Sequence, residues 1–298
     1  MTEFPETDMH EDLPGGATLG VMDAVRMGWR LMMADFWPIW VLGLVAYAIL
    51  AAIGVVGGVI GIVPILGPIV NGCIQLAAGI FVQPPIMAGF FYAIRNCIDG
   101  SPPQVGEVFE GFRQRYWQSV VAMLLPNIIS FVAAVLIGGI VVAAVIIGEE
   151  AGSDEEVAVA VGIALAIVIP LAIILCLVML LFLFSLLAVW DHPESGWQAM
   201  KDSVRLVKAH YWSCIGLALL FVVIAVAAVL AGLIACCVGV LFTMPVLMVW
   251  WSATLIYLYR SWTGQPLVQP LMAEPPVEDT GPVPPADIEP PPPAPPMP

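Results

Sequence analysis

Apolar residues run along this chain in long unbroken stretches, and polar residues are confined to the segments between them. No charged residue occurs from Trp37 to Ile94. A helix needs only about 20 residues to cross the ~30 Å hydrocarbon core of a bilayer, so this stretch is long enough to cross twice. Proline and glycine cluster at 61–68, which predicts crossings at about 37–61 and 68–94.

The same reasoning divides the rest of the chain. One apolar stretch covers 118–148 and another covers 157–190, with an acidic loop between them. Both exceed the length that a perpendicular crossing needs, so tilt or protrusion is expected. The last stretch, 212–259, also needs a break, which we place near Cys236 and Gly239. The sequence therefore predicts an all-α integral membrane protein with six transmembrane helices.

The basic residues predict the orientation. All nine Lys and Arg fall before the first crossing, after the sixth, or in the loops that follow the second and fourth, and the three opposite loops have none. Since cytoplasmic loops are enriched in Lys and Arg, we expect a bacterial inner-membrane protein with both termini in the cytoplasm. Eight tryptophans lie near the same side: Trp29, Trp37, Trp40, Trp117, Trp190, Trp197, Trp212 and Trp262.

Composition agrees with a bilayer environment. Apolar residues make up 61% of the 298 residues and charged residues only 11%, whereas soluble domains have about 25% charged residues. The formal charge of −14 comes largely from three stretches that contain acids and no bases, at 1–12, 149–156 and beyond 261. These values exclude a free nucleic-acid binder, a coiled coil and a secreted disulfide scaffold. Segment 1–17 and the Pro-rich tail 263–298 are expected to be disordered.

A short amphipathic segment ending in two aromatic residues precedes each odd-numbered crossing. The pairs are Phe36-Trp37, Tyr116-Trp117 and Tyr211-Trp212. We interpret the pattern as three pseudo-repeats, each an interfacial amphipathic helix followed by a helical hairpin. Ser101 and Pro102 are expected to begin the second amphipathic helix, as its N-cap and first helical residue. The alternative is that any entry into a membrane collects a small residue, an arginine and an aromatic pair.

The third amphipathic segment has the clearest pattern. Apolar residues from Trp197 to Tyr211 recur at steps of three and four, and Lys201, Arg205 and Lys208 form the opposite stripe. This pattern is typical of a helix in the headgroup plane, where each base adds ~1 kcal/mol of attraction to anionic lipid. The three bases and Trp197 are therefore candidate membrane-surface residues. The alternative is that these helices connect the crossings and pack on the bundle.

Four amide side chains are candidate polar residues inside the bilayer. Asn71, Gln75 and Gln83 share one face of the second crossing, and Asn127 lies on the third. They either hold helices together, at ~0.6 kcal/mol per interhelical contact, or line a polar route for a neutral solute. Small residues on the first crossing allow close helix contact, inside the bundle or across a homo-oligomer: Gly54, Gly57, Gly58 and Gly61.

Residues that usually carry chemistry are scarce. No Asp, Glu, Lys, Arg or His lies within a predicted crossing, which disfavours proton relays, voltage sensors and ion-coupled transport. The six cysteines lack Cys-x-x-Cys spacing, no histidine stands near them at ligand spacing, and no catalytic or nucleotide-binding motif occurs. We therefore expect no catalytic, metal-binding or cofactor-binding residue, and no enzyme activity.

The succession of Gly-Trp-Arg or Ser-Val-Arg, an aromatic-Trp pair and a hairpin resembles a loose group of bacterial six-helix membrane proteins of undefined role. The group includes the membrane domain attached to some glycerophosphodiester phosphodiesterases. The resemblance covers about 18–262, which we take as the six-helix domain, and is strongest at 23–37, 111–117 and 198–212. The soluble phosphodiesterase portion has no counterpart in this chain, so no catalytic residue carries over. The resemblance implies an inner-membrane helical bundle with an accessory or structural role.

Three functions are compatible with these features. The favoured one is a non-catalytic membrane protein that organises the bilayer, anionic lipids included, or scaffolds a membrane complex through its cytoplasmic-leaflet amphipathic helices. The alternative is a transporter or channel for a neutral or lipidic solute. In a third, the Pro-rich tail docks a cytoplasmic partner such as a soluble enzyme.

Overall fold

The computed structural model describes residues 19–63, 66–150, 154–192, 194–234 and 238–267. Within these ranges the chain is helical and contains no strand, as the apolar pattern predicts. The helices are α1 (Val21–Ala34), α2 (Phe36–Gly61), α3 (Leu66–Phe81), α4 (Gln83–Ile98), the 3-10 helix η1 (Val105–Phe109), α5 (Glu110–Gln114), α6 (Tyr116–Glu150), α7 (Asp154–Leu180), α8 (Ser185–Asp191), α9 (Gly196–Ala209), α10 (Tyr211–Ile234) and α11 (Val238–Thr263).

Within the described residues, six segments are long and apolar enough to cross a membrane, the number that the sequence predicts. Two of them consist of paired helices, since α3 with α4 forms one span and α7 with α8 forms another. The break inferred from glycine and proline at 61–68 agrees with the end of α2 at Gly61. Helix α10 ends at Ile234 and α11 begins at Val238, and Cys236, near which the last break was placed, lies outside the described residues. The described chain therefore has the long apolar helices of a multi-pass membrane protein.

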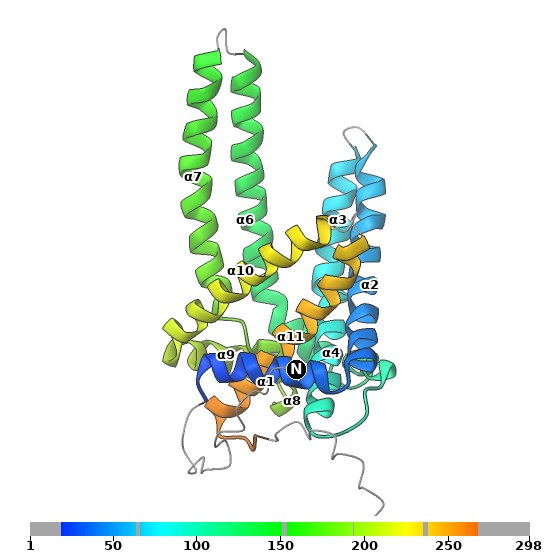
Figure 1. The fold of residues 1–298 in the computed structure, drawn as a ribbon. Coiled ribbons are helices and arrows are strands. Elements are labelled where there is room, and N and C mark those ends of the chain that lie inside the picture. The colour runs from blue at the N-terminus through cyan, green and yellow to red at the C-terminus, as the bar shows by residue number, and fades with distance from the viewer. Residues whose placement is uncertain (1–18, 64–65, 151–153, 193, 235–237, 268–298) are drawn as a thin grey trace, which may run out of the picture.

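Three helical hairpins rise from a common base (Figure 1). They pair α2 with α3, α6 with α7, and α10 with α11. Helices α1 and α9 lie across the base, and α6 and α7 extend furthest from it (Figure 1). All nine Lys and Arg lie on α1, α4, α5, α9, α11 or the residue that joins α5 to α6. We call this base the basic end.

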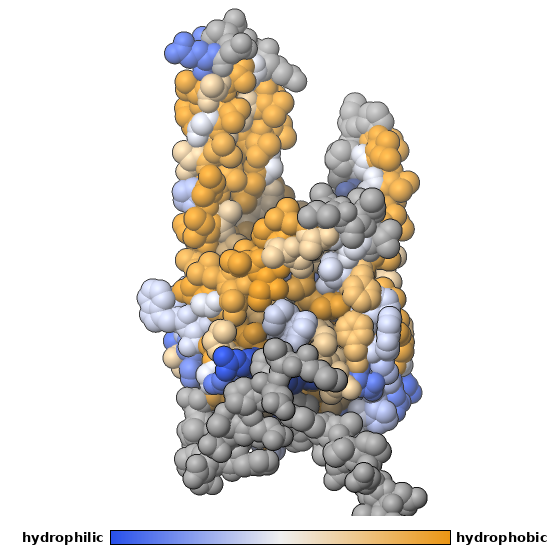
Figure 2. Space-filling model, viewed as in Figure 1, coloured by the Kyte–Doolittle hydropathy of each residue, from blue (hydrophilic) through white to orange (hydrophobic). Residues whose placement is uncertain are grey.

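The tightly packed core lies at the basic end. The spans that contain α4 and α11 contribute several of its largest side chains, including Phe90, Ile94 and Tyr257. Half of the most apolar window of each of these spans is buried, compared with 11% for α6 and 6% for the span of α7 and α8. Away from the basic end, the apolar surfaces of the α6–α7 and α2–α3 hairpins stand apart (Figure 2). The bundle is thus packed at one end and splayed at the other.

Each segment that precedes an odd-numbered span packs on the end of an even-numbered one. Helix α1 lies against α11, η1 and α5 lie against α4, and α9 lies against α8 and α6. In the first of these contacts, Trp250 Nε1 donates a hydrogen bond of 2.9 Å to the carbonyl of Val25. The N–H of Leu19 donates to Ser261 Oγ at 2.6 Å. The apolar face of α1 is therefore covered by the last span.

Two consecutive prolines divide α3 from α4. Pro84 and Pro85 have no N–H to donate, and the helix breaks just before them, at Val82. On α6, Asn127 Nδ2 donates a hydrogen bond of 2.7 Å to the carbonyl of Gly79, in the last turn of α3. An amide on the neighbouring span thus satisfies an acceptor beside the break.

The span of α7 and α8 breaks at a turn rather than at its proline. Helix α7 continues through Pro170 and ends at Leu180, and residues 181–184 form the turn before α8. The hydroxyl of Ser203 on α9 accepts from the N–H of Phe184 at 3.1 Å and donates to the carbonyl of Leu181 at 3.0 Å. One buried side chain therefore satisfies two backbone groups of the turn.

The second amphipathic segment is less regular than predicted. Ser101 caps no helix, because residues 101–104 are not helical and η1 begins at Val105. The backbone of this segment lies directly on α4, so a Cβ at Gly111 would collide with the carbonyl of Pro85. Helices that pack through side chains keep their axes about 8–10 Å apart. The close backbone contact therefore favours a 3-10 turn and one short helix over a regular amphipathic helix.

Candidate functional site

Six side chains at the basic end form two neighbouring sets of hydrogen bonds, one among Arg95, Asp191, Tyr259 and Gln265 and one between Asp99 and Arg260. We call them the polar cluster: Arg95, Asp99, Asp191, Tyr259, Arg260 and Gln265. They come from the ends of the three even-numbered spans, because α4, α8 and α11 all finish at the basic end (Figure 1).

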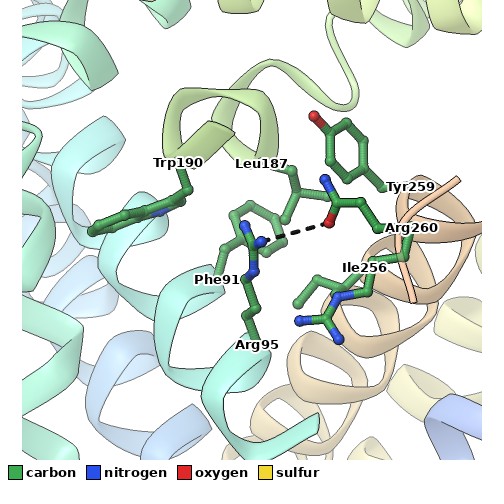
Figure 3. Close-up of a pocket in the computed structure, with 8 residues that line it drawn as sticks. Phe91, Arg95, Leu187, Trp190, Ile256, Tyr259 and Arg260 are labelled. Carbon is green, nitrogen blue, oxygen red and sulfur yellow. Dashed lines mark hydrogen bonds between the residues drawn. The ribbon is translucent and has the colours of Figure 1, made fainter. Parts of the chain in front are cut away.

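Asp191, at the end of α8, is the main acceptor of the polar cluster. Its carboxylate accepts from Arg95 Nη1 at 3.0 Å, from the Tyr259 hydroxyl at 2.7 Å and from Gln265 Nε2 at 2.8 Å. Arg95 Nη2 also donates to Gln265 Oε1 at 3.5 Å, the contact dashed in Figure 3. Asp191 is therefore tied to both α4 and the end of α11.

Arg260 and Asp99 form the second ion pair of the cluster. The two Nη atoms of Arg260 donate to the two carboxylate oxygens of Asp99 at 2.6 and 2.7 Å. This two-point geometry is the strongest arrangement that an arginine makes with a carboxylate. It fastens α11 to α4, directly beside the contacts of Asp191.

Together these contacts connect the three even-numbered spans in a circle. Arg95 joins α4 to α8, Tyr259 joins α11 to α8, and Arg260 joins α11 to α4. These three side chains surround a small cavity (Figure 3). The apolar part of its lining is Phe91, Leu187, Trp190 and Ile256. The cavity volume of about 10 Å³ has room for about one water molecule.

The polar cluster links the ends of separate spans to one another. Its two arginines balance its two aspartates in formal charge, and its hydrogen bonds join separate spans. Removing one partner of a buried ion pair costs about 3–5 kcal/mol, because the other charge stays behind without compensation. The contacts around the cavity hold the three spans together. The cavity itself is too small to admit a solute.

Trp190, the residue before Asp191, anchors α8 on α4. Its Nε1 donates a hydrogen bond of 2.9 Å to the carbonyl of Ala88. Its ring stacks on Tyr92 with centroids 4.4 Å apart, and the guanidinium carbon of Arg115 lies 5.9 Å from the ring centroid. The position of Asp191 is thus fixed by the packing of its neighbour as well as by its own hydrogen bonds.

The candidate membrane-surface residues lie on the outer side of α9. Lys201, Arg205 and Lys208 are exposed, and Trp197 is 48% exposed with Lys201 Nζ 5.8 Å from its ring centroid. Trp197 lies outside the buried face of α9, and its neighbour Gly196 lies so close to the backbone of Gln118 that a Cβ there would collide with the Gln118 carbonyl. The buried face of α9 consists of Gly196, Ala199, Met200, Ser203 and Val207.

An exposed tryptophan begins each odd-numbered span. We call Trp37, Trp117 and Trp212 the rim tryptophans, and they are 65%, 66% and 81% exposed. Each ring stands edge-on to the aromatic residue before it, with centroids 5.5, 5.0 and 6.3 Å apart. Indole favours the boundary between hydrocarbon and headgroups. We therefore expect the three indole rings to lie at one depth in the bilayer, at the headgroup boundary of the basic end.

The four candidate intramembrane amides are not gathered along one route. Asn71 and Gln75 on α3 lie against Gly57 of α2, where the missing side chain leaves them space. Asn127 contacts the backbone of Gly79, and Gln83 is exposed. The placements of Asn71, Gln75 and Asn127 are contacts between neighbouring helices.

The polar cluster was not predicted from the sequence. The sequence placed Arg95 in the loop after the second crossing and Arg260 after the sixth, and paired neither with an acid. A signal was nevertheless present, because both arginines lie in the last turn of an apolar helix and both aspartates directly follow an apolar span. Opposite charges at the ends of three spans that finish on the same side are candidates for pairing.

One family model matches most of the chain, including the whole of the described fold. Residues 19–274 match a family described as a domain of unknown function, DUF7847. No curated protein and no solved structure matches the chain. The matched region contains the six spans, the segments that precede them and the polar cluster. The chain therefore belongs to the DUF7847 family.

Proposed function

We propose that this protein is a non-catalytic multi-pass membrane protein that organises the cytoplasmic leaflet of the bacterial inner membrane. The observation that carries the proposal is the concentration of exposed tryptophans and outward-facing bases at one end of the molecule. In this proposal both termini lie in the cytoplasm, the basic end faces the cytoplasmic headgroups, and the anionic lipids of that leaflet are the partner.

The outer surface of α9 supports an attraction to anionic lipid. Lys201, Arg205 and Lys208 are exposed on one stripe, and each base near an anionic surface adds about 1 kcal/mol. Because the buried face of α9 is covered by α6 and α8, the helix acts through charge and through Trp197 rather than by inserting an apolar face. The rim tryptophans would hold the bundle at the same depth.

The contrast between a fastened base and splayed hairpins supports an organising role. The polar cluster ties the even-numbered spans together at the basic end, whereas α6 and α7 expose most of their apolar surface. A rigid base with separated hairpins offers surface for lipid chains between them (Figure 2). The placement of the amides in contacts between helices gives no similar support to the alternative of a solute route.

A threefold repeat is part of the proposal. Each unit would consist of an interfacial segment followed by a hairpin, with α1, η1–α5 and α9 as the interfacial segments. Three small residues at corresponding positions, Gly28, Gly111 and Ser203, support it. Each is buried against an even-numbered span. The Pro-rich tail 268–298 lies outside the described residues, so docking of a partner there stays a prediction.

Reconstitution tests the proposal. The purified protein is placed in vesicles that contain spin-labelled phosphatidylglycerol or spin-labelled phosphatidylcholine, and the immobilised fraction of each lipid is measured with the vesicle size distribution. We expect preferential immobilisation of the anionic lipid and altered vesicle sizes, and we expect Lys201→Gln, Arg205→Gln and Lys208→Gln together to weaken both effects. Lys201→Arg with Lys208→Arg preserves the charge and should behave as the parent. Identical lipid immobilisation and vesicle sizes in parent and triple variant would refute the proposal.

A further inference from the structure

An apolar groove lies on the α6–α7 hairpin at the end opposite the polar cluster. It runs between Ile140–Ile147 of α6 and Glu155–Ile167 of α7, and its volume is about 690 Å³. Along α7 the groove is about 18 Å long at 1.5 Å per residue. It is therefore longer than half of the ~30 Å hydrocarbon core and long enough to receive an acyl chain of one leaflet.

Small side chains on both helices create the groove. Ala143 and Ala144 on α6 and Ala160 and Ala164 on α7 line it, with larger isoleucines beside them. Both helices expose most of their remaining apolar surface in this region. A hollow in a surface of this kind is filled by an apolar chain from the surroundings, since water inside it would gain few hydrogen bonds.

The length of the hairpin places the groove near the outer boundary of the bilayer. The uncharged part of α6, residues 118–148, is about 46 Å long and exceeds the ~30 Å of hydrocarbon. A span that is too long tilts or raises the lipid around it. In a tilted or lipid-raising arrangement, as opposed to a protruding one, the outer part of the hairpin, which holds the groove, meets the lipids of the leaflet opposite the basic end.

The charge at the outer end of the groove selects the headgroup. Glu155 and Glu156 belong to the groove lining, and no Lys or Arg occurs between Arg115 and Lys201. A carboxylate attracts a primary ammonium group, which carries three hydrogen-bond donors, and repels an anionic headgroup. A second copy of this chain would bring further carboxylates to the same place, so it complements the groove less well.

We propose that this groove binds a phospholipid of the outer leaflet that carries a primary ammonium headgroup. An acyl chain lies between α6 and α7, and the ammonium group lies against Glu155. This site is separate from the cytoplasmic-leaflet surface of the proposed function. Loss of one activity with retention of the other therefore distinguishes the two proposals.

Native mass spectrometry of the full chain in mild detergent tests the groove. The probes are phosphatidylethanolamine, phosphatidylcholine and phosphatidylglycerol with identical acyl chains. We expect the parent to retain phosphatidylethanolamine at least fivefold more than either of the other two lipids. The quaternary ammonium of phosphatidylcholine has the same charge but no N–H donor, so it separates hydrogen bonding from charge.

Two pairs of substitutions separate headgroup from chain binding. Glu155→Gln with Glu156→Gln, at exposed positions, should reduce retention of phosphatidylethanolamine to the level of phosphatidylcholine. Ala143→Leu with Ala160→Leu fills the groove and should abolish retention of both. Ala134→Leu, on an exposed part of α6 outside the groove, should leave retention unchanged. Equal retention of the three lipids by the parent, unchanged retention in the glutamine variant, or a lipid-free dimer would each overturn the inference.

Discussion

Arg260 and Asp99 share two hydrogen bonds, but the two side chains differ greatly in exposure. The Arg260 side chain is 5% exposed and the Asp99 side chain is 41% exposed. Solvent can therefore replace the partner of the carboxylate if the arginine is removed, whereas it cannot reach the guanidinium if the aspartate is removed. Loss of Asp99 and loss of Arg260 should therefore lower the stability of the fold by different amounts.

This asymmetry predicts unequal effects of substitution. Asp99→Asn leaves a buried guanidinium without its counter-charge and should lower the free energy of unfolding by about 3 kcal/mol. Arg260→Met keeps an apolar stem of similar length and leaves a hydrated carboxylate, so the loss should be about half as large. Thermal unfolding in detergent micelles, followed by circular dichroism, measures both. Equal losses, or a larger loss for Arg260→Met, would contradict the burial argument.

The hydrogen bond from Asn127 to the carbonyl of Gly79 predicts a second contrast. Asn127→Leu leaves that carbonyl without its side-chain donor beside the proline break and should cost about 1 kcal/mol of stability. Gln83→Leu changes an exposed amide on the span that contains Gly79, and should change stability by less than about 0.5 kcal/mol. The comparison uses the midpoint of thermal unfolding in the same detergent. A neutral Asn127→Leu would show that the contact contributes nothing.

Close backbone packing between α5 and α4 predicts that Gly111 tolerates no side chain. Gly111→Ala would drive a methyl group into the carbonyl of Pro85 and should destabilise the protein by about 1–3 kcal/mol. Gly106→Ala is the matched control, because a Cβ there meets open space. Yield of monodisperse protein and its unfolding temperature report the difference. Similar behaviour of the two alanine variants would contradict the packing.

The proposed orientation predicts the accessibility of two introduced cysteines. In a background without the six native cysteines, Glu156→Cys should react with an impermeant maleimide in intact spheroplasts. Gln198→Cys on α9 should react only after the membrane is opened. Both parent side chains are exposed, so neither result depends on burial within the protein. Labelling of Gln198→Cys from outside, or protection of Glu156→Cys, would reverse or invalidate the orientation.

Helix positions could be predicted from the sequence because each depends on local features. An uncharged stretch long enough to cross a bilayer, ended by glycine and proline, located α2 and the break before α11 to within a few residues. The turn at 181–184 could not be predicted in this way. It lies in continuous apolar sequence, and the hydroxyl that satisfies it belongs to Ser203 on another helix.

The candidate site was harder to predict because its partners are distant in the chain. Arg95 and Asp191 are 96 residues apart, and Asp99 and Arg260 are 161 residues apart. The two arginines were expected on one side of the molecule, but their pairing with Asp99 and Asp191 depends on how three spans converge. The interfacial segments show the same limit. Periodicity indicated amphipathic helices, whereas the direct backbone contact of Gly111 with α4 determined a shorter, less regular segment.

The contact between α1 and α11 has a consequence for how the protein is made. Val25 and Trp250 are 225 residues apart, so at about 5–20 residues per second a ribosome needs on the order of 10–45 s to supply the partner of the first helix. During that interval the first helix lacks the contacts with α11 that cover it in the finished fold. Assembly of the fold can therefore be completed only after the last helix has been synthesised, and a chain truncated before it would leave its first helix undocked.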